Sequence, residues 1–246
     1  MTPCTPSTSI SRVLALFSIS LWIVQSGVIR PAIGQDAPVT KPATQAAEKP
    51  ASKSIDSAWK QMTFKPSESK VGWEASEFGG DGKVDWNGES VILGTGQPMT
   101  GVRFTGEFPK DQFEVRFNAR RVDGDDFFVG FTFPIVKEHC SLILGGWSGS
   151  ISGLSNINGY DASENPTTFF QNFKNGQWYR IRLMVTPEKI QAWVDDKQVV
   201  DRDREGTRFG VRLEVNPSLP LGFACYRCTA EIRGFEYHEL PEEPGR

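Results

Sequence analysis

Apolar and polar residues alternate with a period of two along much of this chain. In QFEVRFNARRV, residues 112–122, every second residue from Phe113 to Ala119 is apolar, and the residues between them are charged or asparagine. In WYRIRLMV, residues 178–185, every second residue from Tyr179 to Val185 is again apolar. Because successive side chains of an extended strand point to opposite faces, both stretches predict half-buried antiparallel strands.

Turn signals separate these strands. Lys-Asn-Gly-Gln at 174–177 precedes the second strand, and Asp195-Asp196 joins KIQAWV to KQVVD as a tight hairpin. The alternation changes phase at Gly234, which predicts a β-bulge there. Helical spacing is not sustained anywhere. About a dozen short strands with turns rich in glycine and proline predict an all-β fold, an antiparallel two-sheet jelly-roll sandwich.

The ends of the chain have a different composition. Residues 1–34 contain Arg12, a twelve-residue apolar run from Val13 to Val24, and a small-residue cleavage site before Gln35, which predicts a secretory signal peptide. Residues 35–57 are rich in proline, alanine and lysine and predict a disordered linker. The β-sandwich domain is expected over 58–240, and 241–246 form a flexible tail. We therefore expect export to the periplasm or the extracellular space, without membrane insertion after cleavage.

Net charge argues against one class of partner. Removing the leader, which holds two arginines and no acid, leaves 25 basic and 30 acidic residues, a net charge of −5. Such a domain lacks the basic surface that attracts phosphate backbones, so nucleic acid is not an expected partner.

The strand and turn pattern resembles a known family. The family is the bacterial secreted 3-keto-disaccharide hydrolases, within the concanavalin A-like superfamily; its members begin on a Trp-containing strand, like SAWKQMTF here, and end on a strand like AEIRGFEY. The resemblance covers roughly residues 59–240 and includes FKNGQWYRIRLMVTPEKIQAWVDDKQVVD and LGFACYRCTAEIRGFEYHEL. It implies a concave sheet that receives carbohydrate.

The chain lacks the acidic E-x-D-x-E strand of glucanases with this fold. The nearest candidate strand, 112–122, has only Glu114 among arginines on its polar face. Hydrolysis by two carboxylates needs an acid pair across a cleft, so ordinary glucanase chemistry is disfavoured.

The stretch from Gly145 to Thr167, GGWSGSISGLSNINGYDASENPT, is a candidate binding loop. An exposed Trp147 indole can stack on a sugar ring, and the flanking glycines permit close approach to the backbone. Hydrogen-bonding groups would come from Asn156, Asn158 and Tyr160. The alternative is that Trp147 plugs the end of the sandwich while the polar residues only form turns.

Two residues are candidates for a general base. Asp126 ends the cluster Asp123-Gly-Asp-Asp126 and directly precedes the strand-like FFVGFTF. The cluster is typical of a polar hairpin tip. Its carboxylates are also the ligand type of calcium or another divalent metal, but nothing else in the sequence supports a metal site. His139 is the second candidate, since histidine titrates near neutral pH. No cofactor is predicted.

Three cysteines remain after the leader. Residues three apart on one strand point to opposite faces, so Cys225 and Cys228 pair with each other only if a turn intervenes. Export favours disulfides, and Cys140 with Cys225 or Cys228 is the expected bridge. A zinc site using His139 and the cysteines conflicts with the divergence of adjacent strand residues.

Three functions fit these observations. The resemblance implies a glycoside hydrolase acting on 3-keto-disaccharides, in which a single base removes an acidified proton and elimination followed by hydration opens the glycosidic bond. A carbohydrate-binding module without chemistry fits the loop equally. A structural or adhesive envelope domain fits the linker but not the composition of 145–167.

Overall fold

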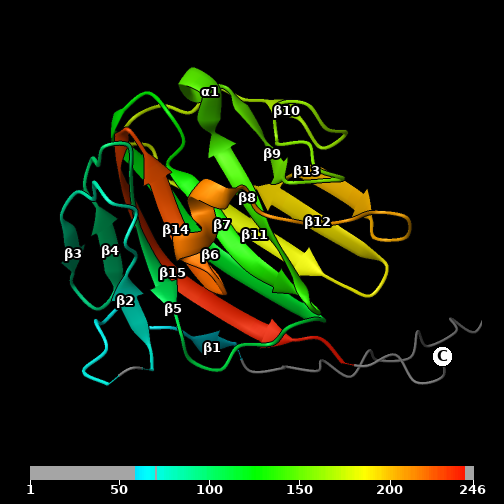
Figure 1. The fold of residues 1–246 in the computed structure, drawn as a ribbon, viewed down its shortest axis with the longest axis horizontal. Coiled ribbons are helices and arrows are strands. Elements are labelled where there is room, and N and C mark those ends of the chain that lie inside the picture. Colours follow the sequence, from blue (N-terminus) through cyan, green and yellow to red (C-terminus); the bar gives the residue numbers. More distant parts are fainter. Residues whose placement is uncertain (1–58, 70, 242–246) are drawn as a thin grey trace, which may run out of the picture. The chain divides into compact units, whose positions relative to one another are not determined.

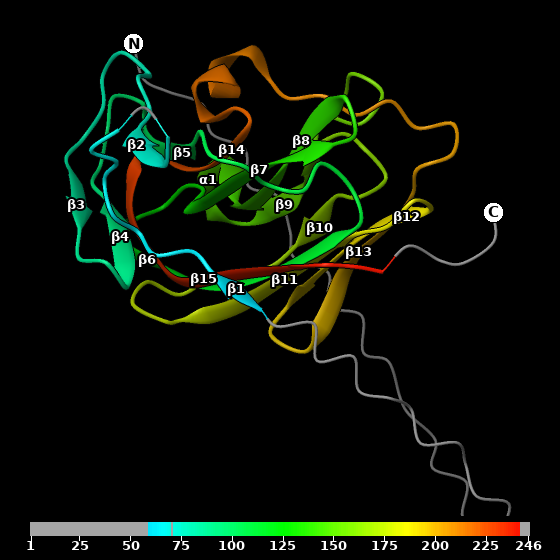
Figure 2. The ribbon, with the colours of Figure 1, turned by 90° about the horizontal axis from the view of Figure 1, so that it is seen from below.

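A computed structural model of the chain describes residues 59–69 and 71–241. The predicted signal peptide, the predicted linker and nearly all of the predicted tail lie outside these residues. Within the described part, the chain forms two antiparallel sheets that pack face to face (Figures 1 and 2). None of the helices in that part is long and apolar enough to cross a membrane.

The first sheet is called the β6 sheet, after its central strand. Its strands are, in spatial order, β13 (Lys197–Asp203), β12 (Lys189–Val194), β11 (Tyr179–Val185), β6 (Phe113–Gly124), β15 (Cys228–Glu239), β4 (Ser90–Leu93) and β3 (Val84–Trp86), with β1 (Lys60–Gln61) paired to β15.

The second sheet is called the β7 sheet. Its strands are β10 (Phe169–Phe170), β9 (Ile151–Ser155), β8 (Glu138–Gly145), β7 (Val129–Ile135), β14 (Leu221–Tyr226), β5 (Met99–Phe104) and β2 (Trp73–Ala75). Two short helical segments accompany it: α1 (Gly146–Gly149) follows β8, and the 3-10 helix η1 (Leu213–Ser218) precedes β14. In Figure 2 the orange η1 segment lies on the outer side of this sheet.

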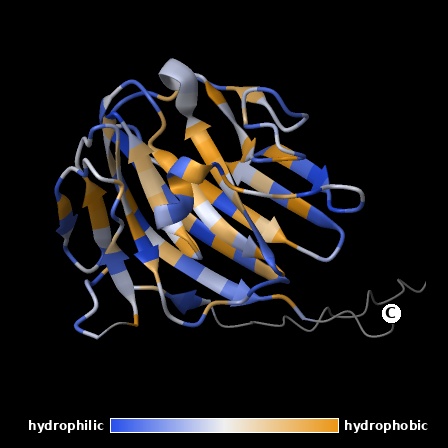
Figure 3. Ribbon diagram, viewed as in Figure 1, coloured by the Kyte–Doolittle hydropathy of each residue, from blue (hydrophilic) through white to orange (hydrophobic). Residues whose placement is uncertain are grey.

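Aromatic side chains fill the space between the sheets. The Phe223 ring of β14 lies 4.8 Å from that of Phe131 on the neighbouring strand β7, and 5.0 Å from that of Phe117 on β6 of the other sheet. Phe235 packs edge-on against Phe223 at 5.3 Å. Burial of this cluster explains why one face of each central strand is apolar, an alternation visible along the ribbons in Figure 3.

The structure confirms the predicted sandwich. Strands β6 and β11 occupy the two stretches of strict alternation and pair with each other, from Tyr179 opposite Ala119 to Val185 opposite Phe113. The hairpin between β12 and β13 turns at Asp195, whose φ is 55°. The predicted bulge is also present, because Gly234 has a φ of 61° and the β15–β6 register shifts between Arg233 and Glu236.

Two local predictions were wrong. Asp123–Asp126 is not a hairpin tip, because β6 and β7 belong to different sheets and the segment carries the chain from one layer to the other. The stretch from Gly145 to Thr167 is not one long loop, because Ile151–Ser155 forms β9 against β8. Its small residues do not show the alternation of an amphipathic strand. They suit a strand whose outer face must leave room for groups that lie above it.

The expected disulfide from Cys140 is not formed. All three cysteines of the described residues are buried free thiols. Cys140 lies on β8 and Cys225 on β14, and β7 separates these strands, so their Cα atoms are about 10 Å apart or more. A disulfide needs Cα atoms within about 7 Å. Cys228 lies on β15 of the other sheet.

Candidate functional site

The outer face of the β7 sheet has mostly short side chains at its centre, so the surface there is low. One row of paired positions crosses five strands and consists of Gly101, Ala224, Gly130, Ile143 and Gly153. The next row contains Gly222, Thr132, Ser141 and Ser155, and the Thr132 and Ser141 hydroxyls are 2.8 Å apart. A sheet surface built from glycine, alanine and hydroxyl residues leaves room for other groups above it.

Parts of the chain lie directly on this low surface and form walls. A Cβ atom on Gly222 would come within 2.6 Å of the Ser218 carbonyl oxygen, which shows how closely η1 rests on β14. A Cβ on Gly130 would come within 3.0 Å of the Phe127 ring. Between these walls the surface stays open.

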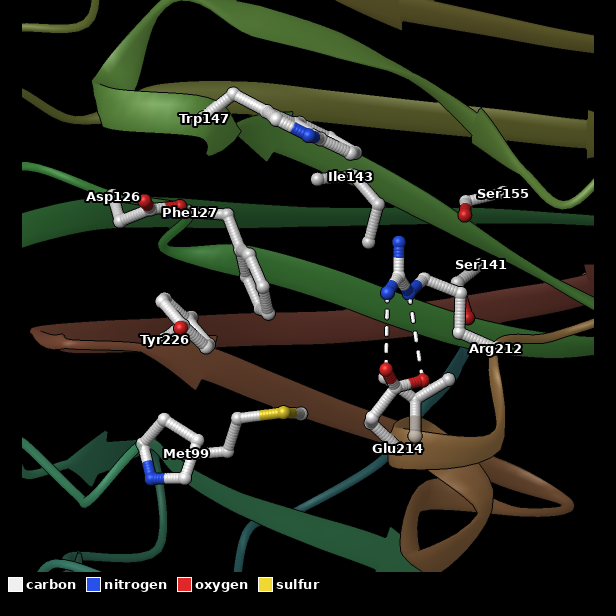
Figure 4. A pocket seen from close by; sticks show the side chains of 12 residues that line it. Met99, Asp126, Phe127, Ser141, Ile143, Trp147, Ser155, Arg212, Glu214 and Tyr226 are labelled. Carbon is white, nitrogen blue, oxygen red and sulfur yellow. Dashed lines mark hydrogen bonds and ion pairs between the residues drawn. The ribbon is translucent and has the colours of Figure 1, made fainter. Parts of the chain in front are cut away.

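The opening is a pocket of about 480 Å³. Figure 4 shows Trp147 and Ile143 on one side, Asp126, Phe127 and Tyr226 on another, and Arg212 with Glu214 opposite them. The lining residues come from β5, β8, β9, β14, η1 and the segments beside them: Pro98, Met99, Asp126, Phe127, Ser141, Ile143, Trp147, Ser155, Arg212, Glu214, Val215 and Tyr226. The pocket thus combines an apolar platform with a few charged and hydroxyl groups, as ligand sites do.

Trp147 is held outward by an unusual backbone. Trp147 and Ser148 both have left-handed dihedrals, with φ of 49° and 64°, and Gly145 and Gly149 on either side also have positive φ. Non-glycine residues adopt this conformation at a cost, and such strain concentrates at functional sites. The Trp147 side chain remains 37% exposed and extends over Ile143 in Figure 4. It is not a plug inside the sandwich, so the alternative of a buried indole was wrong.

The Asp126 carboxylate is tied to the Trp147 turn. Its Oδ2 accepts a hydrogen bond from the Ser148 backbone N–H at 3.1 Å, and its Oδ1 accepts one from the Phe127 N–H at 2.8 Å. A carboxylate has about four lone-pair positions, so each oxygen keeps one position for a ligand. The two segments singled out in the sequence, around Asp126 and around Trp147, therefore meet at one edge of the pocket.

A buried arginine fixes the backbone beneath Asp126. Arg121, only 6% exposed, donates from Nη1 to the Asp126 carbonyl oxygen at 3.0 Å and from Nη2 to the Phe173 carbonyl oxygen at 2.6 Å. Its Nε donates to the Asn175 side chain at 2.6 Å. Three bonds from one rigid guanidinium hold the crossover segment against the loop before β11.

The opposite wall carries a cation between two carboxylates. Arg212 Nη1 donates to Asp161 at 2.7 Å, and Nη2 donates to Glu214 at 3.0 Å. The hydrogen bond from Arg212 lowers the pKa of the Glu214 carboxyl, which is therefore a weaker base than an isolated glutamate. The guanidinium has five N–H donors, and with a longer bond from Nε to Glu214 at 3.4 Å all three of its nitrogens are engaged with carboxylates.

Three predicted ligand residues do not line the pocket. The Asn158 side chain accepts a hydrogen bond from the Arg208 N–H at 2.8 Å, and the Asn156 backbone pairs with Gly210. Tyr160 is 58% exposed, and its backbone pairs with Ile157. Asn156 and Asn158 therefore hold the segment 208–210, which leads to Arg212. They contribute to the site indirectly, by positioning this segment.

His139 lies at the far end of β8. Gly145, at the Asp126 end of this strand, is six residues away, which corresponds to about 20 Å along an extended chain. The two candidate bases are thus not brought together. Burial, followed by the charge of Lys110, lowers the pKa of His139, so its imidazole is neutral near pH 7.

The lowered pKa of His139 predicts a pH-dependent stability. As pH falls through about 6.5, the unfolded state takes up a proton before the folded state does, so stability decreases toward the folded pKa. We expect His139→Gln to lose less thermal stability than the wild type between pH 7.5 and 5.5. Thermal melts of both proteins across this range measure it; equal losses would show that His139 does not contribute.

Within the described residues, no group of three or more His, Cys, Asp or Glu side chains is arranged to hold a metal ion. Asp123 and Asp125 are exposed, while Asp126 is turned toward the Trp147 segment. The cluster therefore does not gather its carboxylates around one point.

A comparison with models of known families identifies the family of this chain. A family model described as a 3-keto-alpha-glucoside-1,2-lyase-like domain matches residues 53–235. The chain belongs to this family. The resemblance inferred from strand and turn positions is confirmed. Among curated proteins, no sequence matches this chain.

Three solved structures are similar to this chain at low identity. A β-1,3-1,4-glucanase (lichenase) from a mouse hindgut metagenome is 8% identical, covers 74% of this chain and 99% of its own, and has a TM-score of 0.49. Carbohydrate-binding module CBM66 from Bacillus subtilis is 11% identical over 69% and 96%, with a TM-score of 0.45. Domain 4 of the arabinanase AbnA from Geobacillus stearothermophilus, in complex with arabinotriose, is 13% identical over 76% and 95%, with a TM-score of 0.46. These identities are too low to transfer a ligand or an activity.

Several lining residues of the lyase-like domain were missed in the sequence. Ser141 and Ile143 share one face of the run CSLIL, and because apolar Ile143 stands beside polar Ser141 the sequence does not mark this face as the open one. Arg212 and Glu214 lie in an irregular segment without periodicity, and only the folding of η1 over β14 brings them to the pocket. Tyr226 follows the alternation of β14 and was predictable as an outer residue.

Proposed function

We propose that this protein binds a 3-keto-disaccharide in the pocket and cleaves it by elimination and hydration, with Asp126 as the general base. The observation that carries the proposal is the meeting of the Asp126 carboxylate and the exposed Trp147 indole at one pocket edge, joined through the Ser148 N–H. Membership of the lyase-like family supports the substrate class.

The chemistry needs one base and a polarised ketone. The ketone at C3 acidifies the proton on C2, which Asp126 removes. The electron pair forms a double bond between C2 and C1, the bond from C1 to the glycosidic oxygen breaks, and the leaving alcohol takes up a proton. Water then adds across the double bond, with hydroxide to C1 and a proton to C2. The net reaction is hydrolysis.

Groups on the opposite wall suit the ketone and the negative charge that develops on it. Arg212 carries a permanent positive charge, and the Ser141 hydroxyl lines the same side. Donors placed where charge develops stabilise the transition state more than the ground state. The indole of Trp147 provides an apolar platform for a sugar ring.

Asp126 suits the role of base better than two other residues. Glu214 is engaged by Arg212, which lowers its pKa and its basicity. His139 is neutral at pH 7 but lies at the other end of β8 and does not line the pocket.

The experiment offers two substrates that differ only at C3. Purified protein is incubated with a 3-keto-disaccharide and, separately, with its parent disaccharide, and the released sugar is quantified. We expect cleavage of the keto compound and none of the parent, because elimination requires the acidified C2 proton. Binding of the keto compound without cleavage would favour a carbohydrate-binding module, and equal cleavage of both would indicate ordinary glycoside hydrolysis.

Removing the indole tests the platform. Trp147→Ala is expected to weaken binding of the 3-keto-disaccharide by about tenfold or more, because one stacked aromatic surface is lost. Titration calorimetry with each variant measures the affinity. Tyr160→Ala, which removes an exposed aromatic residue outside the pocket, serves as the control and should bind like the wild type. The reverse pattern would move the site to the Tyr160 loop.

We also propose that the chain is exported to the periplasm or the extracellular space. The support is the layout of residues 1–34. N-terminal sequencing of the protein recovered outside the cytoplasm should begin at Gln35, and an intact Met1 would contradict cleavage.

A further inference from the structure

Two cysteines lie close together where the chain passes between the sheets. Cys225 is near the end of β14, and Cys228 is the first residue of β15. Tyr226 and Arg227 turn the chain between them, and Arg227 has a φ of 48°. Because of this turn, the strand rule that sends residues three apart to opposite faces does not apply.

The Cys225 sulfur atom lies in contact with the Cys228 residue. Cys225 Sγ lies 3.2 Å from the Cys228 carbonyl oxygen, and both side chains are fully buried. A hydrogen bond with the Cys228 thiol, together with burial, raises the pKa of Cys225 well above its ordinary value. Neither cysteine is exposed to solvent, and among the described residues neither belongs to a group that could hold a metal ion.

The Cys228 thiol proton is not needed to pair the carbonyl that it contacts. Cys228 Sγ lies 3.1 Å from the Phe127 carbonyl oxygen, but the Tyr226 N–H donates to the same oxygen at 2.9 Å. Loss of the Cys228 proton therefore leaves that carbonyl paired. The Leu93 carbonyl oxygen is 3.7 Å from Cys225 Sγ, which is a weak contact at most.

We propose that Cys225 and Cys228 are a modification site, an intramolecular disulfide that ties β14 of one sheet to β15 of the other. The oxidant is a low-molecular-weight disulfide, RSSR. The thiolate of one cysteine attacks RSSR, forms a mixed disulfide and releases RSH. The second thiolate then attacks the cysteine sulfur of that mixed disulfide and releases the second RSH, so two electrons pass from the cysteines to the oxidant.

The burial of both sulfurs determines when the bond forms. The thiolate is the reacting species, and an enclosed thiol with a raised pKa reacts slowly. The bond therefore forms while the chain folds, before β14 and β15 close over it. Oxidant added to the folded, reduced protein should act slowly.

Peptide mapping tests the bond. The full chain is refolded with oxidised and reduced glutathione, free thiols are alkylated in denaturant, and a tryptic digest is analysed without reduction. Cleavage after Arg227 separates Leu213–Arg227 from Cys228–Arg233. We expect these two peptides to be joined and Cys140 to be alkylated. Alkylation of both Cys225 and Cys228, or Cys140 in a linked peptide, would overturn the proposal.

Thermal unfolding gives a second measurement that does not depend on mapping. A disulfide across a four-residue loop should raise the melting temperature of the oxidised protein by about 5 °C over the reduced protein. Cys140→Ser should keep this difference, whereas Cys225→Ser with Cys228→Ser should abolish it. Equal melting temperatures of oxidised and reduced wild type would contradict a stabilising bond at this position.

Discussion

Replacing Asp126 by asparagine is expected to lower the rate of 3-keto-disaccharide cleavage by about 10²- to 10⁴-fold, the contribution of a positioned general base. Asparagine can still accept a hydrogen bond from the Phe127 or Ser148 N–H, so the turn that carries Trp147 should persist. The rate constant kcat, measured under saturating substrate, is the quantity to compare, and substrate affinity should change little.

Asp125→Asn is the matched control for this change. It makes the same substitution one residue earlier, on an exposed side chain that does not line the pocket. Its kcat should equal that of the wild type. If Asp126→Asn retains full activity, or if both variants lose activity equally, Asp126 is not the base.

Truncating Phe223 to alanine is expected to reduce the free energy of unfolding by about 3 to 5 kcal/mol, the usual cost of removing a buried phenylalanine. Phe223 is fully buried, and its ring contacts aromatic residues of both sheets, including Phe131 and Phe235. The cavity would lie where the two layers are joined, so relaxation around it is limited. Urea denaturation followed by fluorescence measures the loss.

Phe170→Ala is the control for the core variant. Phe170 lies on edge strand β10 and is 73% exposed, so its removal should change the free energy of unfolding by less than about 0.5 kcal/mol. A small loss for Phe223→Ala would show that the aromatic cluster is not the centre of the core.

The central strands were predictable because one physical cause fixes them. Strands β6 and β11 each have one face in the core and one in solvent, so their sequences alternate strictly and reveal both the strand and its orientation. The bulge at Gly234 was predictable for the same reason, since inserting a residue must shift the phase. Asp126 and Trp147 were found because charged and aromatic residues stand out in stretches that lack a core pattern.

The features that were not predicted depend on which strands become neighbours. Strand β9 was missed because its outward-facing residues are small: Gly153 lies against Thr167 and Ser155 lines the pocket, and small residues carry no amphipathic signal. The position of Cys140 two strands from Cys225 follows from the sheet order, which local alternation does not encode. Arg212 reaches the pocket only through the path of η1, far along the chain from Trp147.

The most direct test of the account is a crystal structure of Asp126→Asn with a 3-keto-disaccharide bound. We expect one sugar ring to lie against the Trp147 indole, with its C2 atom about 3 Å from the side chain at position 126 and its C3 oxygen toward Arg212 and Ser141. A sugar bound on the outer face of the β6 sheet, or one in the pocket with C2 directed away from position 126, would contradict the account.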